Sequence, residues 1–155
     1  MTETTTITYR PGPIPANASP IARRLIAIAN LVPAGRWVTY GDLAEAAGSS
    51  PRGVASALSS VSPWEDDPED NADSIARWVV PWHRIRMEDG RLKSREAQLR
   101  ALGQTPREHH RLANAMYAAE RGSLFIYQGE EAARGSQRFL LAAEMRHGRV
   151  KVDDA

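Results

Sequence analysis

The residues best suited to chemistry in this chain stand in the stretch VVPWHRIRMEDGRL, residues 79–92. Trp82, His83 and Arg84 follow an apolar run that ends in Pro81, and the polar turn MEDG comes shortly after them. An aromatic ring beside an imidazole and a guanidinium is a combination of side chains that is typical of a binding or catalytic site. No nucleophile lies next to it, however, and the chain contains no cysteine. Thiolate catalysis, disulfides and cysteine-based zinc sites are therefore excluded.

The histidines do not indicate a metal site. They are His83, His109, His110 and His147, and the adjacent pair 109–110 points to different faces of a helix. The strings HExxH, GxGxxG, GxxxxGK[ST] and GxSxG are all absent, so the sequence favours no metalloprotease, dinucleotide enzyme, P-loop enzyme or ordinary α/β-hydrolase. We expect neither a metal nor a cofactor. A Ser–His–carboxylate triad with members distant in the chain stays open, although nothing in the sequence points to one.

Length and composition predict one soluble domain. The chain has 155 residues, of which 42% are hydrophobic and 25% charged, and no apolar stretch is long enough for a membrane span. The N-terminus lacks the basic start and apolar core of a secretory signal, so we expect a flexible lead-in and a cytoplasmic location. Two basic blocks flank the acidic segment 62–74, and nearly all cations are Arg. This distribution is compatible with nucleic acid, and equally with compositional bias.

Two short helices joined by a glycine-containing turn precede the acidic segment. Asp42 begins the first, which ends at Gly48, and the second runs through PRGVASALSS from Pro51. This pattern predicts a helix-turn-helix whose second helix presents Arg52, Ser56 and Ser59 outward. A helical hairpin inside an all-α core would produce a similar pattern.

The remaining elements complete a mainly α, winged-helix-like fold with a small β element and a helical C-terminal extension. Ser19 and Pro20 open a helix that is over by Pro33, and Thr105 and Pro106 open another. SLFIYQ, residues 123–128, fits either a strand or a helix. The other predictions are a β-like piece at 36–40, a strand interrupted by Pro81 at 75–85, and helices at 94–103 and 130–148. We divide the chain into a lead-in, a domain that contains the helix-turn-helix, and a helical C-terminal extension, at residues 1–18, 19–103 and 104–155.

Three motifs occur together in one order: PAGRWVTYGDLA at 33–44, SPRGV at 50–54, and VPWHRI followed by DGRL at 80–92. The combination resembles the O6-alkylguanine-DNA alkyltransferase family, whose corresponding segments read roughly VPxGxVxTYGxLA, PRxVG and PCHRV. Because Trp82 stands in place of the acceptor cysteine, the chain is similar to the alkyltransferase-like proteins, the non-enzymatic branch that carries PWHR. The resemblance covers roughly residues 19–102.

The resemblance implies a lesion-binding site. It places the helix-turn-helix in the minor groove and flips the damaged base into a pocket. Tyr40 would crowd the 3′ phosphate, Arg52 would fill the gap left in the duplex, Trp82 would pack against the alkylated base, and Arg95 would lie beside that base. Each of the four also has a structural alternative, as an ordinary core or surface residue.

Further residues follow from the same resemblance. The supporting DNA contacts would be Thr39, Ser50, Pro51, Gly53, Ala55 and Ser56. Pro81, His83 and Arg84 would shape the pocket, with His83 as a structural hydrogen-bonding residue. Ala55 departs from the family, which commonly has glycine there, and the acidic segment is longer than the family's usual link.

The implied function is non-enzymatic binding of O6-alkylguanine in duplex DNA, with base flipping and flagging for nucleotide excision repair proteins. One alternative is a helix-turn-helix transcription regulator that reads intact sequence. Another is an enzyme with a hidden nucleophile, although the missing cysteine argues against an alkyltransferase. The C-terminal helices could pack on the domain, dimerise or recruit a partner, and we expect a monomer.

Overall fold

The computed structural model describes residues 8–11, 14–61, 75–76, 78–101, 103–128 and 138–152. Helices dominate these ranges, which confirms the predicted mainly α fold with a small β element. The α-helices are α1 (Pro20–Ala29), α2 (Tyr40–Ala47), α3 (Pro51–Ser59), α4 (Glu96–Ala101), α5 (Pro106–Gln128) and α7 (Leu141–Arg146), and η2 (Trp82–Arg84) is a single 3₁₀ turn.

The short strands form two separate parallel pairs. β1 (Thr8–Tyr9) pairs with β3 (Ile75–Ala76), with Tyr9 opposite Ala76. β2 (Val38–Thr39) pairs with β4 (Ile85–Arg86), with Val38 opposite Ile85. Parallel strands need a long connection between them, and here the helix-turn-helix lies in the connection from β2 to β4.

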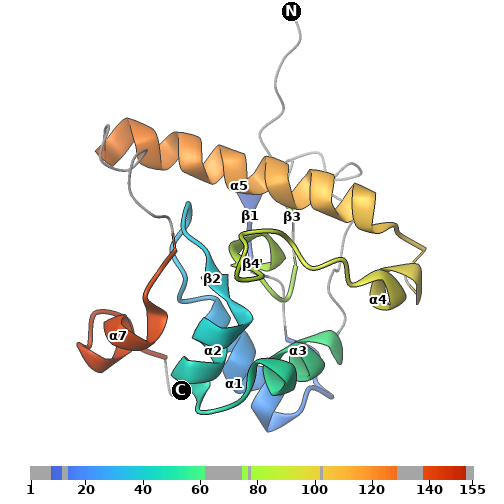
Figure 1. The fold of residues 1–155 in the computed structure, drawn as a ribbon, viewed down its shortest axis with the longest axis horizontal. Coiled ribbons are helices and arrows are strands. Elements are labelled where there is room, and N and C mark those ends of the chain that lie inside the picture. The colour runs from blue at the N-terminus through green and yellow to red at the C-terminus, as the bar shows by residue number, and fades with distance from the viewer. Residues whose placement is uncertain are drawn as a thin grey trace, which may run out of the picture.

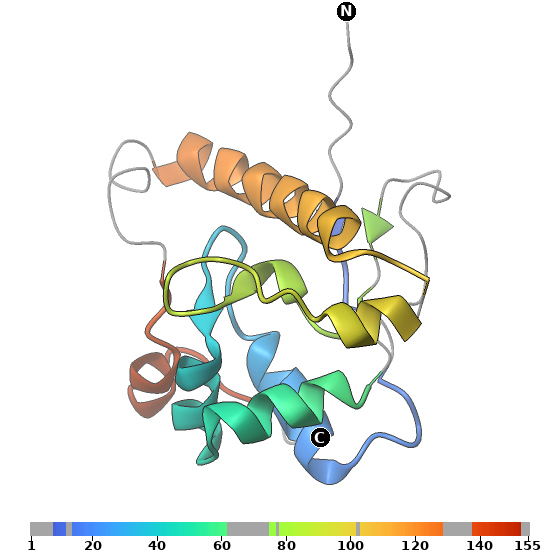
Figure 2. The ribbon, with the colours of Figure 1, turned by 45° about the vertical axis from the view of Figure 1, so that its right-hand side comes forward.

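The helices form two sides with the strand and turn segments between them. The long helix α5 lies across one side of the molecule, and α1, α2 and α3 gather on the other (Figures 1 and 2). α5 contacts η2 and β1, while α7 packs against α2. The part of the chain after residue 104 therefore covers both the central turn and the helix-turn-helix. The division at residue 103 stays a prediction.

The hydrophobic core fills the space between these layers. Its largest fully buried side chains include Trp78, Leu25, Leu43, Leu58 and Met116. Tyr9 also belongs to the core, with 8% of its surface exposed, although it lies in the segment for which we expected a flexible lead-in. Its hydroxyl donates a hydrogen bond to Asn30 Oδ1 at 2.8 Å, which joins this segment to the end of α1.

Capping interactions determine where the helix-turn-helix begins and ends. α2 begins at Tyr40, two residues before the predicted Asp42, because Thr39 and Asp42 form a capping box. The Asp42 N–H donates to Thr39 Oγ1 and the Thr39 N–H donates to Asp42 Oδ2, both at 3.0 Å. Gly48 ends α2 in the left-handed conformation, at a φ of 69°.

The predicted starts of α1, α3 and α5 are confirmed. Ser19 Oγ accepts the Ala22 N–H at 3.1 Å, Ser50 Oγ accepts the Gly53 N–H at 3.0 Å, and Thr105 Oγ1 accepts the Glu108 N–H at 3.2 Å. A proline fills the first helical position after each cap, where its missing N–H costs no hydrogen bond.

The prediction of one strand over residues 75–85 is wrong for its centre. Trp82, His83 and Arg84 form the 3₁₀ turn η2, in which the Arg84 N–H donates to Pro81 O at 2.9 Å. Pro81 has no N–H to give to a strand ladder, and the chain turns directly after it. Strand pairing resumes only at Ile85.

The C-terminal region also differs from the sequence prediction. SLFIYQ is helical, because α5 continues unbroken to Gln128. The helix predicted at 130–148 is wrong for residues 138–140: Arg138 forms a bridge with Trp37, and the Phe139 N–H donates to Trp37 O at 2.7 Å. Buried Phe139 anchors this extended piece. Residues 130–137 of that predicted helix, and the acidic segment 62–74, lie outside the described residues.

Candidate functional site

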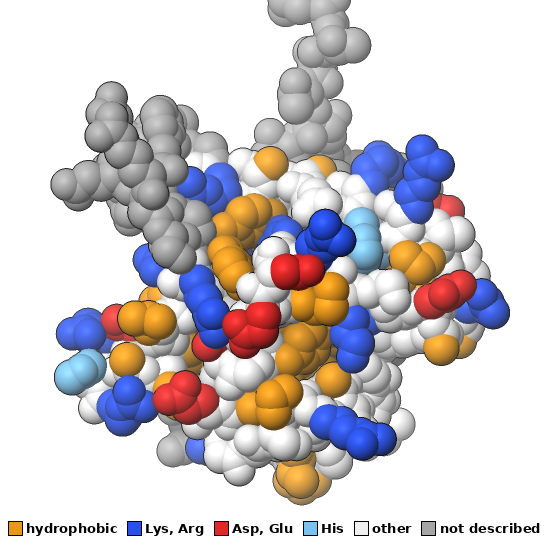
Figure 3. All heavy atoms as spheres, in the orientation of Figure 1, with side chains coloured by type: hydrophobic (Ala, Val, Ile, Leu, Met, Phe, Trp, Pro, Cys, Tyr) orange, Lys and Arg blue, Asp and Glu red, His pale blue; other side chains and the backbone are white. Residues whose placement is uncertain are grey.

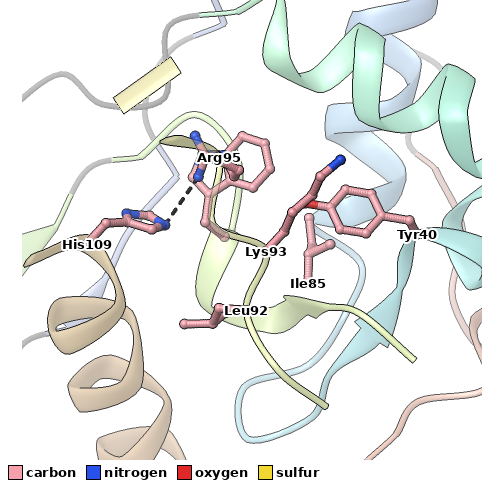
Figure 4. A pocket seen from close by; sticks show the side chains of 7 residues that line it. Tyr40, Ile85, Leu92, Lys93, Arg95 and His109 are labelled. Atoms are coloured by element: carbon pink, nitrogen blue, oxygen red, sulfur yellow. Dashed lines mark hydrogen bonds between the residues drawn. The ribbon is translucent and has the colours of Figure 1, made fainter. Parts of the chain in front are cut away.

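A small pocket lies where η2, the start of α2, the loop after β4 and α5 meet. The space between its side chains, counted together with the part that is open to solvent, amounts to about 160 Å³. The side chains lie so close together that no water molecule fits between them. Its lining is drawn in Figure 4 and consists of Tyr40, Trp82, Ile85, Leu92, Lys93, Arg95 and His109. Three of the four residues for which the resemblance implies lesion contacts therefore meet in one place.

Trp82 is the central side chain of this pocket. It is 2% exposed, and its indole Nε1 is buried with no hydrogen-bond partner among the described residues. A buried donor without a partner costs about 1–3 kcal/mol, so a bound acceptor would be favoured there. The indole cannot accept an alkyl group by displacement as a thiolate does, and it can instead pack against a planar base.

Arg95 closes the pocket by stacking on this indole. Its guanidinium carbon lies 3.5 Å from the centre of the Trp82 ring, the geometry of a cation–π contact. Arg95 Nη1 donates to His109 Nε2 at 3.2 Å, which Figure 4 shows as a dashed line. Its backbone φ of 50° is left-handed, a conformation that costs a non-glycine residue about 1–2 kcal/mol.

Burial controls the charge of both partners. It lowers the pKa of Arg95 to about 10, so the guanidinium stays protonated at neutral pH. Burial, assisted by the charge of Arg95, lowers the pKa of His109 to about 3. His109 is therefore neutral and can accept the hydrogen bond from Arg95.

Tyr40 forms the opposite wall, at the first position of α2. The ammonium of Lys93 lies 5.4 Å from the centre of its ring, and the two side chains approach each other from different segments (Figure 4). Burial raises the pKa of Tyr40 against the opposing charge of Arg95, so the phenol is neutral. Thr39 is buried below it as the α2 cap.

Arg52 lies outside the pocket, at the second position of α3. It is exposed and makes no hydrogen bond or ion pair with the described residues, while buried Val54 and Leu58 fix the helix beneath it. The neighbouring positions are accessible to different extents: Ser50, Pro51 and Ser56 are exposed, and Gly53 and Ala55 are half-buried.

Gly53 fits a close turn at the start of α3. A Cβ at this position would lie 2.9 Å from Ser49 Oγ and 3.1 Å from Ser50 Oγ, the latter being the oxygen that caps the helix. Any larger residue would push against the cap that orients Arg52.

Glu120 of α5 supports the turn that carries Trp82, a role that no motif in the sequence indicates. His83 Nε2 lies 2.8 Å from Glu120 Oε1, and Arg84 Nε donates to both carboxylate oxygens at 3.1 and 3.2 Å. The Gly35 N–H donates to Glu120 Oε2 at 3.1 Å. Arg84 Nη1 also donates to Val32 O at 3.0 Å, so the carboxylate and Arg84 join α5, η2 and the end of the α1 region.

The protonation states in this cluster are well defined. Burial alone would raise the pKa of Glu120, but the hydrogen bonds from His83 and Arg84 hold it at about 2. Burial lowers the pKa of His83, which is 0% exposed, despite the neighbouring carboxylate. Neutral His83 thus donates its Nε2–H to ionised Glu120. This hydrogen bond attaches the turn η2 to α5.

Arg138 connects the C-terminal segment to the cap of α2. Its Nε and Nη2 bind the two oxygens of Asp42 at 2.8 Å each, and Nη1 donates to Glu88 Oε2 at 3.1 Å. Burial would raise the pKa of Asp42, but Arg138 and the Thr39 N–H hold it below its usual value. The start of α2, where Tyr40 lies, is thereby fixed by a residue of the C-terminal segment.

The surface around the site mixes apolar and basic side chains. On the face shown in Figure 3, hydrophobic side chains gather near the centre and Lys and Arg side chains are spread around them. No group of three or more His, Asp or Glu side chains in the described ranges is placed to hold a metal ion. Among the same residues, no helix combines the length and apolar composition needed to cross a membrane.

The chain matches the model of a known protein family. The model of the 6-O-methylguanine DNA methyltransferase DNA-binding domain matches residues 20–115, a range that runs from the start of α1 into α5. It includes the helix-turn-helix and every residue that lines the pocket. The searches among curated proteins and among solved structures gave no match.

Proposed function

Because the chain belongs to the family of the 6-O-methylguanine DNA methyltransferase DNA-binding domain, we propose that it binds O6-alkylguanine in duplex DNA without removing the alkyl group. Membership supports DNA as the partner and a role related to repair. The observation that carries the proposal is the pocket around Trp82, where an indole is buried in a chain that has no cysteine.

Base flipping is the step that would bring the lesion to this pocket. Rotating a nucleotide out of the duplex costs a few kcal/mol, and less for a poorly paired base. In the proposed complex Tyr40 crowds the phosphate beside the pocket and Arg52 fills the vacated position in the stack. The exposure of Arg52 and the planarity of its guanidinium support that role.

The flipped base would be held by contacts that a damaged purine can satisfy. Trp82 offers an aromatic face and a buried N–H that has no partner among the described residues, and Arg95 offers a cation for the π-face of the base. No group in this set could complete an alkyl transfer. We propose that the resulting long-lived complex marks the lesion for nucleotide excision repair proteins.

A helix-turn-helix transcription regulator is the rival function. Such a protein reads base edges in the major groove through side chains such as Asn, Gln and Arg on its second helix. The exposed residues of α3 include Pro51, Arg52, Ser56 and Ser59, which is a poor set for that purpose.

The test combines binding with the chemical fate of the lesion. The protein is incubated with two duplexes of identical sequence that carry guanine or O6-methylguanine at one position. Binding is measured by gel shift, and the masses of the DNA strands and of the protein are then determined by mass spectrometry. We expect a stronger shift with the lesion duplex, and unchanged masses of DNA and protein. Equal shifts would contradict lesion recognition, and a DNA strand lighter by one methylene would contradict a non-enzymatic function.

A further inference from the structure

Gln98 of α4 joins the pocket to the helix-turn-helix. Its side-chain oxygen accepts hydrogen bonds from Arg95, through Nε at 2.8 Å and through Nη2. Its side-chain nitrogen donates to Ser59 O at 3.1 Å and to Val61 O at 3.4 Å. One amide thus connects the guanidinium that covers Trp82 with the C-terminal end of α3.

The position of Arg95 excludes any other occupant from this face of the indole. The guanidinium stacks at 3.5 Å from the ring centre, and the remaining space is too narrow for a water molecule. A purine can stack on the same face only after the guanidinium moves away. Arg95 lies between the loop and α4, and its backbone has the left-handed conformation, which is unfavourable for a residue other than glycine. Its surroundings therefore hold Arg95 in this position against a backbone cost.

α3 is also the helix that carries Arg52 at its other end. A docked duplex would contact α3 directly, and a displacement of its C-terminal carbonyls would act on the Gln98 nitrogen. The hydrogen bonds run from α3 to Gln98, from Gln98 to Arg95, and from Arg95 to the face of Trp82.

We propose that Gln98 is a positioning residue that keeps the pocket closed by holding Arg95 on Trp82 and releases it when α3 docks on DNA. The inference rests on the proposed function, because it concerns the entry of a flipped base. The protein that can accept a base is then a minor fraction of the free protein, and capture of the lesion is slowed in proportion.

Two substitutions of the same residue separate this role from a merely structural one. Gln98→Met keeps the side-chain length but removes the hydrogen bonds that residue 98 makes with Arg95, Ser59 and Val61. Arg95 keeps its hydrogen bond to His109, but it is held less firmly on Trp82 and the pocket opens more often. Gln98→Glu keeps an acceptor for Arg95 and adds a charge, which strengthens that pair, while it loses the donor to Ser59 O and Val61 O. Gln104→Met is the matched control, since the Gln104 side chain makes no hydrogen bond with the described residues.

The measurement is stopped-flow fluorescence with a labelled O6-methylguanine duplex, read as the rate of the slow phase that follows docking. We expect the Met variant to be at least threefold faster than the unsubstituted protein, the Glu variant at least threefold slower, and the Gln104 control unchanged. Rates for the guanine duplex should be equal in all four proteins. Shifts in the same direction, or no shift in either Gln98 variant, would overturn the proposal.

A second readout keeps this test independent of the proposed function. The Arg95 Nε–H signal in ¹H–¹⁵N NMR spectra of the free protein should be protected from solvent exchange in the unsubstituted protein and in Gln98→Glu, and lost in Gln98→Met. Its persistence in the Met variant would show that Gln98 does not position Arg95. If instead the unsubstituted protein does not distinguish the two duplexes, the proposed function fails while the NMR result still decides the positioning.

Discussion

Arg52 is exposed at the start of α3 and forms no hydrogen bond or ion pair within the described part of the chain. Arg52→Ala should therefore leave the unfolding free energy unchanged. We expect it to weaken binding of the O6-methylguanine duplex at least tenfold, about 1.4 kcal/mol, because the extruded base leaves a gap that only a long planar cation can fill.

The control for that substitution is Arg24→Ala. Arg24 lies on α1, is likewise exposed, and its side chain makes no hydrogen bond or ion pair with the described residues. Arg24→Ala should weaken binding of the O6-methylguanine duplex only through the loss of one positive charge, and so by less than Arg52→Ala does. If both variants bind the lesion duplex as tightly as the unsubstituted protein, Arg52 does not enter the duplex.

Glu120 anchors the turn that carries Trp82. Its side chain is 12% exposed and receives hydrogen bonds from His83 and Arg84, whose side chains are 0% and 11% exposed. Glu120→Ala leaves a buried cation without its partner, so we expect the unfolding free energy to fall by about 3–5 kcal/mol in urea denaturation.

Glu96→Ala provides the contrast for Glu120. Glu96 is 62% exposed and pairs with Arg100 one helical turn away. Such surface pairs contribute about 0.3–0.5 kcal/mol. Losses of similar size in the two alanine variants would show that Glu120 does not anchor η2.

His109 makes stability depend on pH. Its pKa is about 3 in the folded protein, against an ordinary value near 6.5 in the unfolded chain. The folded state therefore binds fewer protons between these values, and its stability is complete above about pH 6.5 and declines as the pH falls towards 3. At pH 5 the loss from this residue should approach about 2 kcal/mol.

The measurement is urea denaturation at pH 7.5 and pH 5.0 for the unsubstituted protein and for His109→Gln, which retains an acceptor for Arg95. The variant should lose less stability between the two pH values. His83, whose pKa burial also lowers, acts in the same direction and leaves a residual dependence in the variant. An identical pH dependence in both proteins would contradict a neutral, buried His109.

At the scale of the elements, α2 depends on a residue far away in the sequence. Asp42 caps the helix from its third position and also binds Arg138 through both oxygens. Asp42→Ala removes the acceptor of the Thr39 N–H and the ion pair with Arg138 together, while the N–H of residue 42 still donates to Thr39 Oγ1. We expect a loss of about 1–3 kcal/mol in thermal or urea unfolding. Asp89→Ala is the control, because Asp89 is 56% exposed and lies 3.8 Å from Arg91. A loss no larger than that of the control would show that the cap contributes little.

The elements that the sequence predicted best are those with local signals. Ser19, Ser50 and Thr105 each stand before a proline and a helix, and each caps that helix in the structure. The apolar run around Trp82 predicts a strand, because such a short run does not reveal that the chain bends after Pro81. The amphipathic spacing of residues 138–140 predicts a helix, because it does not reveal the pairing with Trp37.

The site was predictable in part for the same reason. Tyr40, Trp82 and Arg95 lie in motifs that could be recognised by their order, and the structure places them around one pocket. Glu120 and Arg138 lie 37 and 96 residues away from the partners that they bind, His83 and Asp42. No local pattern in the sequence encodes such distant ion pairs, and only the packing of α5 and of the C-terminal segment creates them.

At the scale of the whole molecule, the long helix α5 and the C-terminal segment hold the helix-turn-helix and the pocket in one arrangement. α5 contributes His109 and Glu120, and the C-terminal segment contributes Arg138. In the proposed function, this arrangement would place α3 on the DNA and keep the pocket next to it, where a single flipped base could enter.

The most direct measurement is a competition titration at one fixed salt concentration. The protein is held on a labelled O6-methylguanine duplex and displaced by unlabelled duplexes of the same sequence that contain either O6-methylguanine or guanine. Fixed salt is essential, because phosphate contacts make every affinity depend on it. Lesion recognition in the Trp82 pocket predicts at least tenfold more effective displacement by the lesion duplex, and equal displacement by the two duplexes would contradict it.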